Sequence, residues 1–325
     1  PNLLAPDPPE SATVTHPAVF EAAARILLDQ GTRVCYGDSP SFYPLERALR
    51  KSGIQDAADR LGLEPADFST RQRVYFEGGH QNRVFEVARG ALEADGMVSL
   101  PKLKTHGFTL MTGAVKNQFG CLPGVQKSGF HAKLEEPEKF STMLVDLTLF
   151  LRPRLYIMDA VLAMEGNGPR RGNPVPLGLI IMCSDPVALD TVAARVAGID
   201  PGAVPPIVQG ARNGLGTMVD IQVLGERIEE VKKKFSLPRY SGNFKAIPPV
   251  IRNLLKRIIV QQPVIQYDSC TRCHECQKIC PTTPKSILIR ERDNYPEHDY
   301  RHCIRCYCCQ ETCPVGAITI RTKLF

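Results

Sequence analysis

Apolar residues recur at helical spacing and in short runs along the first 245 residues, which predicts helices and strands in turn. A first helix is predicted between Pro17, near its start, and Gly31, which ends it. Its apolar face contains Val19, Phe20, Ala23, Ile26 and Leu27. Apolar runs predict strands over residues 32–37, 74–79, 83–90, 97–100, 155–161 and 177–184. The last run is continuously apolar, so we expect it to be buried on both faces of a sheet.

Further helices complete this alternation. The clearest covers residues 138–151, where one apolar stripe contains Phe140, Met143, Leu144, Leu147, Phe150 and Leu151. Another follows Pro186, with Asp185 as its expected N-terminal cap. Short helices are predicted within 44–66, and residues 205–235 predict a helix, a short strand and a basic amphipathic helix. Residues 1–245 therefore predict an α/β domain with a mostly parallel or mixed sheet and helices on both faces, and we expect one more strand before Pro1.

A basic segment over residues 101–124 carries the first candidate chemistry. Lys102, Lys104 and His106 alternate just after a predicted strand, so an extended chain would project them to one side. Lys116 and Asn117 follow in TGAVKNQFG, which reads as a helix start with Thr109 or Thr112 as a cap. Cations at a helix N-terminus suit a carboxylate or phosphate ligand. The alternative is a solvated basic loop.

Four more residues are candidates for the same site. Lys127 and His131 lie in the next predicted loop, and His106 or His131 could supply a proton. Asp38 follows a strand end, although capping its own loop is an alternative role. Glu165 lies in the glycine-rich segment 163–172, which we expect to form a site loop and which matches no nucleotide-binding motif.

Two cysteine runs near the C-terminus have the spacing of bacterial two-cluster ferredoxins. Cys270 and Cys303, like Cys280 and Cys313, lie 33 residues apart, so the unit is a repeat. Each 4Fe–4S cube needs four thiolates, and the fourth cysteine of each run ligates the other cube. The first cluster is assigned to Cys270, Cys273, Cys276 and Cys313. The second is assigned to Cys303, Cys306, Cys309 and Cys280; two structural zinc sites are the alternative.

Four cysteines lie outside this pattern. Cys308 is expected to be a packed thiol, with a spare ligand as the alternative, and Cys35, Cys121 and Cys183 are scattered without disulfide logic. Cluster ligands and lone thiols together favour a reducing cytoplasm. The sequence contains no signal peptide and no apolar run long enough to span a bilayer.

The segment between the two parts predicts a connection. Residues 246–262 are predicted as a linker and an amphipathic helix, with 263–325 as a small α+β ferredoxin domain. The apolar face contains Val250, Ile251, Leu254, Leu255, Ile258 and Ile259. We expect this helix to dock the ferredoxin domain on the large domain, and a membrane-surface helix is the alternative.

Net charge argues against nucleic acid as a partner. The formal charge is +6 when cysteines are counted as neutral. Eight cluster thiolates and two oxidised cubes, at roughly +2 each, reduce it to about +2. No recognition motif accompanies this small charge, so no nucleic acid is expected to bind.

The order of these motifs resembles the domain-of-unknown-function family 362 fused to a two-cluster ferredoxin module. The resemblance rests on PNLL, THP, GDSP, LPKLKTH, TGAVKNQFG, MEGNGP, SDPVALD and CIRCYCC, and it covers nearly the whole chain. It implies an iron–sulfur protein and no settled reaction.

The sequence leaves two functions open. The first is an oxidoreductase whose two 4Fe–4S clusters deliver low-potential electrons to a small anionic substrate held by the basic segment. The second is a non-catalytic electron carrier or docking subunit, whose lysines pair with an acidic partner protein. Both need an electron donor or acceptor protein, and we favour the oxidoreductase.

Overall fold

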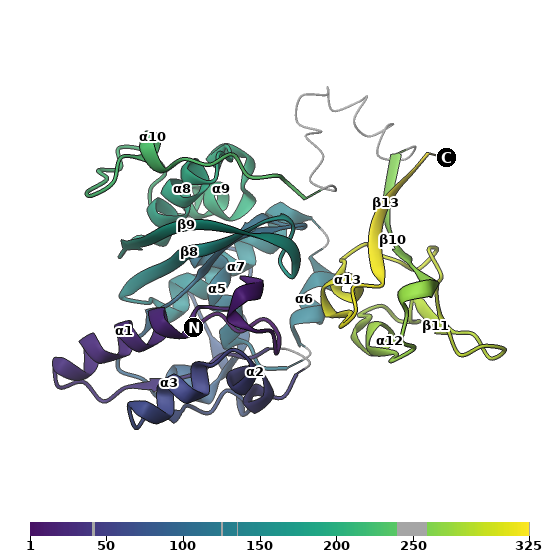
Figure 1. Cartoon of the computed structure of the whole chain (residues 1–325), viewed down its shortest axis with the longest axis horizontal. Helices are drawn as coiled ribbons and strands as arrows, with labels where there is room; N and C mark the ends of the chain where they lie inside the picture. The colour runs from purple at the N-terminus through teal and green to yellow at the C-terminus, as the bar shows by residue number, and fades with distance from the viewer. Residues whose placement is uncertain (41–42, 125, 135, 239–258, 325) are drawn as a thin grey trace.

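The computed structural model describes residues 1–325 except 41–42, 125, 135, 239–258 and 325. Figure 1 shows a large layered domain, coloured purple to green, and a small C-terminal domain beside it, coloured yellow-green to yellow. The large domain is mixed α/β and the small domain is α+β, as the sequence predicted.

A five-stranded mixed sheet forms the centre of the large domain. Its strands are β5 (Val98–Ser99), β6 (Lys102–His106), β7 (Leu110–Thr112), β8 (Leu155–Asn167) and β9 (Arg171–Cys183). β8 is parallel to β5 and β6, whereas β9 is antiparallel to β8 and β7 is antiparallel to β6. Two small sheets join β1 (Cys35–Tyr36) to β2 (Glu64–Pro65) and β3 (Arg71–Tyr75) to β4 (Val84–Ala88).

Helices cover both faces of this sheet. Side chains of β8 alternate, so that Tyr156 and Met158 enter one hydrophobic core and Ile157 packs against another. The first core includes α5 (Ala114–Asn117), α7 (Pro137–Leu151), α8 (Pro186–Val196) and α9 (Pro205–Arg212). The second includes α1 (Pro17–Asp29), α2 (Leu45–Lys51) and α3 (Ile54–Arg60). Among the described residues, this domain also contains the helices α4 (Arg89–Leu92), α6 (Gln126–Lys133) and α10 (Ile228–Val231).

Polar caps fix the start of two helices, and the sequence predicts one of them. The Asp185 carboxylate accepts hydrogen bonds from the N–H groups of Val187 and Ala188, at 2.8 and 3.0 Å. Its expected role as the cap of α8 is therefore confirmed. His16 caps α1, because its Nδ1 accepts from the Ala18 N–H at 3.2 Å.

Two expectations about the long hairpin are wrong. The segment 163–172 is not a long loop, because β8 and β9 extend through it and leave only residues 168–170 as a turn. The run 177–184 is not buried on both faces, because its exposure alternates and, within the described part of the chain, β9 pairs with β8 alone. Ile180 and Met182 are 44% and 64% exposed. An apolar run therefore did not distinguish a central strand from this one.

Two other expectations about local structure are also wrong. The predicted loop that carries Lys127 and His131 is the helix α6, in which the two residues lie four positions apart and share a face. Within 205–235 the described residues contain α9 and the single-turn α10, with no strand between them.

The small domain repeats one unit of structure. α12 (Glu275–Ile279) and α13 (Cys308–Thr312) lie 33 residues apart, like the cysteines. Before them, Arg272 and His274 have positive φ, and so do their repeat counterparts Arg305 and Tyr307. Antiparallel pairs of β10 (Ile259–Ile265) with β13 (Ile318–Leu324) and of β11 (Ile287–Ile289) with β12 (Pro296–His298) complete the domain.

The predicted docking helix falls largely outside the described residues. Residues 239–258 contain most of it. β10 begins at Ile259, so the final part of the predicted helix, residues 259–262, is a strand instead.

Candidate functional site

Two small cavities in the C-terminal domain are each lined by four cysteines drawn from both runs. One is lined by Cys270, Cys273, Cys276 and Cys313. The other is lined by Cys280, Cys303, Cys306 and Cys309. These groups have the same members as the two ligand sets assigned from the sequence.

The backbone explains this grouping. Cys276 lies on α12 and lines one cavity, whereas Cys280, directly after this helix, lines the other. In the second run the order is reversed, because Cys309 on α13 lines the cavity of Cys280, and Cys313, directly after α13, lines the cavity of Cys276. One short helix per run therefore carries the fourth cysteine away from its three neighbours, as two cubes require.

The donor set fits a 4Fe–4S cube better than a zinc ion. Among the described residues, no three His, Cys, Asp or Glu side chains are close enough to hold a single metal ion. Zinc requires that convergence, whereas a cube spreads four thiolates over four irons. Backbone N–H groups support the sulfurs, since Ala317 donates to Cys313 Sγ at 3.2 Å. Burial raises the pKa of the Cys276 thiol to about 12, so a thiolate there needs the positive charge of iron.

A third cavity, of about 110 Å³, lies between the two domains. The large domain lines it with its N-terminal segment, the loop at Asp38, and parts of β6, α5 and α6. The C-terminal domain contributes four residues, which are Ile279, Cys308, Glu311 and Thr312. One wall is therefore basic and belongs to the large domain, and the other belongs to helices that carry the cluster cysteines.

Most of the predicted site residues line this cavity. They are Asp38, Lys104, His106, Lys116, Asn117, Lys127 and His131. Lys102 and Glu165 are not among its lining residues. Glu165 instead accepts a hydrogen bond from the Ser236 N–H at 2.7 Å. The alternative of a solvated basic loop is wrong, because Lys102, Lys104 and His106 form the buried strand β6.

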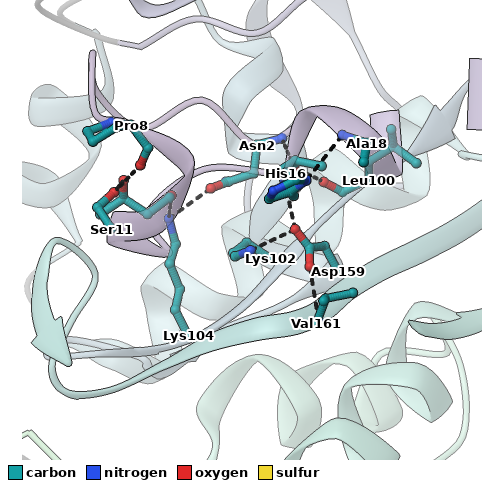
Figure 2. Close-up of polar contacts among 12 residues, drawn as sticks. Asn2, Pro8, Ser11, His16, Ala18, Leu100, Lys102, Lys104, Asp159 and Val161 are labelled. Atoms are coloured by element: carbon teal, nitrogen blue, oxygen red, sulfur yellow. Dashed lines mark hydrogen bonds and ion pairs between the residues drawn. The ribbon is translucent and has the colours of Figure 1, made fainter. Parts of the chain in front are cut away.

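Lys102 is paired with Asp159 in the register of β6 with β8, and the register shifts between Lys102 and Lys104. In Figure 2, Lys102 Nζ donates to Asp159 Oδ2 at 2.6 Å. Both side chains are fully buried, and Asp159 also accepts from the His16 N–H at 2.8 Å. This ion pair joins the sheet to the start of α1 and is a structural contact.

Lys104 is a buried cation without a carboxylate partner in the described chain. Its Nζ donates to Asn2 Oδ1 at 2.8 Å and to the Thr13 carbonyl oxygen at 2.6 Å (Figure 2). Burial is the largest effect on this amine, and nearby Lys116 and Lys102 act in the same direction. Together they lower the pKa of Lys104 to about 7. The amine therefore gains or loses a proton near neutral pH.

Lys116 and Lys127 both lie near the Phe119 ring. Their Nζ atoms are 5.6 and 5.8 Å from the ring centroid. Lys127 donates to the Ser39 carbonyl oxygen, and burial lowers its pKa to about 8. Burial also lowers the pKa of Lys116, which makes no hydrogen bond or ion pair with any residue that the structure describes. Lys116 is thus the cation most available to a ligand.

The helix N-terminus predicted to bind a substrate anion is occupied by Asp190. The N–H groups of Ala114 and Val115 donate to its two carboxylate oxygens, at 2.6 and 3.1 Å. Gly113 stands at the cap position, and neither predicted threonine caps the helix. Burial raises the pKa of Asp190 to about 7 despite these hydrogen bonds. The expected anion site at this helix end is therefore an internal contact between α5 and α8.

The two histidines present different atoms to the cavity. His106 Nδ1 accepts from the Phe108 N–H at 3.0 Å, which places the proton of the neutral ring on Nε2. Burial lowers the pKa of both rings, that of His131 to about 3. His131 stacks on Phe140 with ring centroids 4.4 Å apart, and its buried Nδ1 has no hydrogen-bond partner in the described chain. The Thr112 hydroxyl in the same cavity is also without a partner there.

Asp38 and Asn117 hold the cavity walls together. Asp38 accepts from the N–H groups of Leu3 and Ser39, at 2.5 and 2.7 Å. Asn117 donates to Ser99 Oγ and accepts from Asn2 Nδ2, both at 2.9 Å. Their polar atoms are already in use, so they shape the site more than they offer contacts to a ligand.

Glu311 lines the cavity and was not predicted from the sequence. Cys308 lines the same cavity. Glu311 Oε1 lies 3.5 Å from His106 Nε2, across the domain boundary. Burial raises the pKa of Glu311 to about 7. The available signal was the repeat, because Glu311 and Cys308 replace Lys278 and Glu275 of the first unit. Cys308 is buried between two cysteines of the second set and is packed as expected.

Three side chains of the large domain hold the end of α13. Tyr43 donates to the Thr312 carbonyl oxygen at 2.9 Å, and Arg170 donates to the Tyr43 hydroxyl at 2.8 Å. Arg170 also pairs with Asp7 at 2.8 Å. Arg171 donates to the Cys313 carbonyl oxygen. These contacts set the C-terminal domain against the cavity.

The fold and the cysteine cavities define an iron–sulfur protein with an α/β domain joined to a two-cluster ferredoxin module. A family model described as a domain of unknown function (DUF362) matches residues 1–195, and one for a 4Fe-4S dicluster domain matches residues 262–314. The chain belongs to the DUF362 family.

A curated relative supports the same assignment. It is a thylakoid-associated protein of Synechocystis, 31% identical over 265 residues, covering 80% of this chain and 82% of the relative. Among the described helices, none has the length and apolar character needed to span a membrane. The dicluster domain gives the chain an iron–sulfur electron-transfer role and implies a redox partner.

Proposed function

We propose that this protein is an oxidoreductase that passes electrons from two 4Fe–4S clusters to a small anionic substrate in the cavity between its domains. One observation carries the proposal. The cavity that gathers the predicted lysines and histidines is closed by Ile279, Cys308, Glu311 and Thr312, and each of these adjoins a predicted cluster ligand or lies between two of them on α13. Substrate and electron source therefore share one wall.

The charges of the cavity favour an anion. Lys104, Lys116 and Lys127 line it, and no ion pair within the described chain neutralises any of them. Asp38 is engaged with two backbone N–H groups. An anionic ligand would compensate Lys116 and reach the unpartnered hydroxyl of Thr112. A carboxylate or a phosphate has the required charge and acceptors.

The residues around the cavity have separable roles. When bound, the clusters supply single electrons. Lys116 binds the anionic group, and His106 donates a hydrogen bond from Nε2. Lys104, with a pKa of about 7, holds a proton that can be transferred near neutral pH. His131, with a pKa of about 3, stays neutral and offers Nδ1 as an acceptor.

Electrons would enter from another protein at the first cluster. Cys273, one of its predicted ligands, is exposed, whereas Cys309 and Cys280 of the second set are buried. An exposed edge lets a donor approach closely. A cytoplasmic location remains a prediction, and the relative is named for its association with thylakoids.

The test is substrate-dependent reoxidation. Protein reduced with dithionite and freed of excess reductant is mixed anaerobically with small carboxylates and phosphates, and the visible cluster absorbance is followed. At least one compound should reoxidise the wild type. Lys116→Met should slow this by about tenfold or more, because hydrogen bonds to charged groups contribute about 1.5–3 kcal/mol.

The control is Lys278→Met, because that lysine is 65% exposed on α12 and, among the described residues, forms an ion pair with Glu275 alone. It should leave the rate unchanged. Equal rates for Lys116→Met and the wild type would contradict the proposal. Reoxidation by a protein acceptor alone would favour the electron-carrier alternative.

A further inference from the structure

Arg171 reaches from the large domain to a predicted ligand of the first cluster. It is the first residue of β9, and its Nη2 donates a hydrogen bond to the carbonyl oxygen of Cys313. Its Cζ atom lies 3.1 Å from the point where a Cβ atom at Gly316 would stand. A side chain at Gly316 would therefore crowd the arginine, and the glycine leaves room for it.

The charge of Arg171 is not neutralised locally. Neighbouring Arg170 forms a two-point contact with Asp7, with both distances 2.8 Å. Arg171 is half-buried, and no carboxylate of the described chain lies within ion-pair distance of it. Its Nε is buried and has no hydrogen-bond partner among the described residues. A guanidinium stays charged at any physiological pH, so a net positive charge stands beside the loop of Cys313.

Cys280, the counterpart of Cys313 in the first run, accepts a hydrogen bond from a cation that is more exposed to solvent. The carbonyl oxygen of Cys280 accepts a hydrogen bond from Lys285 Nζ at 2.5 Å. Lys285 is exposed and belongs to the C-terminal domain itself. Water screens an exposed charge, whereas a half-buried charge acts through a lower effective dielectric. The same backbone atom therefore meets unequal cations in the two runs.

We propose that Arg171 raises the reduction potential of the first cluster, so that docking of the large domain separates the potentials of the two clusters. Reduction adds one electron to a cube and makes its net charge one unit more negative. A nearby uncompensated cation favours that reduced form, since charge and hydrogen bonding set the potentials of such clusters. The inference needs both clusters but does not depend on what the cavity binds.

The experiment is a potentiometric titration followed by EPR. Anaerobic protein of measured iron and sulfide content is titrated with dithionite and mediators, and Cys273→Ser identifies the midpoint of the first cluster. Arg171→Gln should lower that midpoint by about 59 mV, which is a tenfold change for a one-electron couple. A unit charge about 10 Å away, at an effective dielectric of about 20, has an effect of that order.

Two variants serve as matched controls. Lys285→Gln should change the reduction constant of the second cluster by less than about threefold, because its charge is screened. Arg170→Gln combined with Asp7→Asn should leave both midpoints at the wild-type values, because that ion pair carries no net charge. An unchanged first midpoint in iron-replete Arg171→Gln, or an equal shift in the Asp7→Asn, Arg170→Gln double variant, overturns the inference.

If Arg171→Gln loses iron, Arg171→Lys is titrated in its place. Lysine keeps the charge without the planar fork, so both midpoints should match the wild type, and a tenfold shift there overturns the inference. A wild-type protein without about eight irons would instead overturn the proposed function.

Discussion

The two units of the ferredoxin repeat share a backbone but differ in what their helices face. In the first unit, Glu275 and Lys278 of α12 form an ion pair of 2.7 Å with side chains 32% and 65% exposed. In the second, the same positions of α13 are Cys308 and Glu311, which line the cavity against the large domain. The cluster ligands are the same in both units. Positions 308 and 311, at which the two units differ, lie on the side of α13 that faces the large domain.

This difference explains why a cysteine occupies position 308. It has no place in the ligand spacing, and its counterpart in the first unit is the partly exposed Glu275. An ionised side chain at position 308 would be buried at the domain boundary, which is unfavourable without a partner. A small thiol fits that boundary and leaves the neighbouring ligand Cys309 undisturbed.

The largest expected effect separates ligand from non-ligand cysteines in the two units. Cys276→Ser and Cys309→Ser should each reduce the iron content from about eight to about four per chain, because each removes one ligand of one cube. Cys308→Ser should retain about eight irons. Anaerobic iron and acid-labile sulfide assays measure both quantities.

Cys308→Ser is the matched control, since it changes the same side chain one position away from a ligand. A loss of about four irons in this variant would show that Cys308 is a cluster ligand. It would contradict the assignment of Cys308 to the cavity-facing side of α13.

A smaller effect concerns the cavity that Cys308 and Glu311 of the second unit line. The lowered pKa values of Lys104 and Lys127, about 7 and about 8, mean that both amines lose their charge as the pH rises through these values. Sulfate keeps its charge throughout, so its affinity should be constant below about pH 6.5 and fall above it. One pH unit above an amine's pKa, about a tenth remains charged, which weakens binding about tenfold. Calorimetric titration at several pH values measures this.

The groups that act on Lys104 are Lys116, Lys102, Asp38 and Asp7. Lys278→Met, on the solvent-facing helix of the first unit, should leave the sulfate profile unchanged. A sulfate affinity that rises with pH, or one that Lys278→Met weakens, would show that the cavity cations do not hold the anion.

The sequence was sufficient where local spacing determines geometry. The cysteine runs predicted both ligand groups, and the helix over 138–151 follows from its apolar stripe. Convergence of Lys104, His106, Lys116, Lys127 and His131 also followed, because the basic segment and the next helix lie on one side of the domain. These inferences needed only periodicity and motif spacing.

Long-range pairing decided what the sequence could not predict. Asp190 occupies the N-terminus of α5 from 76 residues away. Lys102 meets Asp159 because the two are paired positions of strands that are distant in the chain. Glu311 reaches the cavity only because the two domains dock. None of these contacts has a local signature, since each depends on which surfaces the folded chain brings together.

We propose that two 4Fe–4S clusters lie beside the cavity, and the wild-type protein offers the most direct test. Anaerobic purification with iron and sulfide counts is followed by a dithionite titration monitored by EPR. We expect about eight irons and two interacting S = 1/2 signals on full reduction. About two zinc ions and no EPR signal would contradict it.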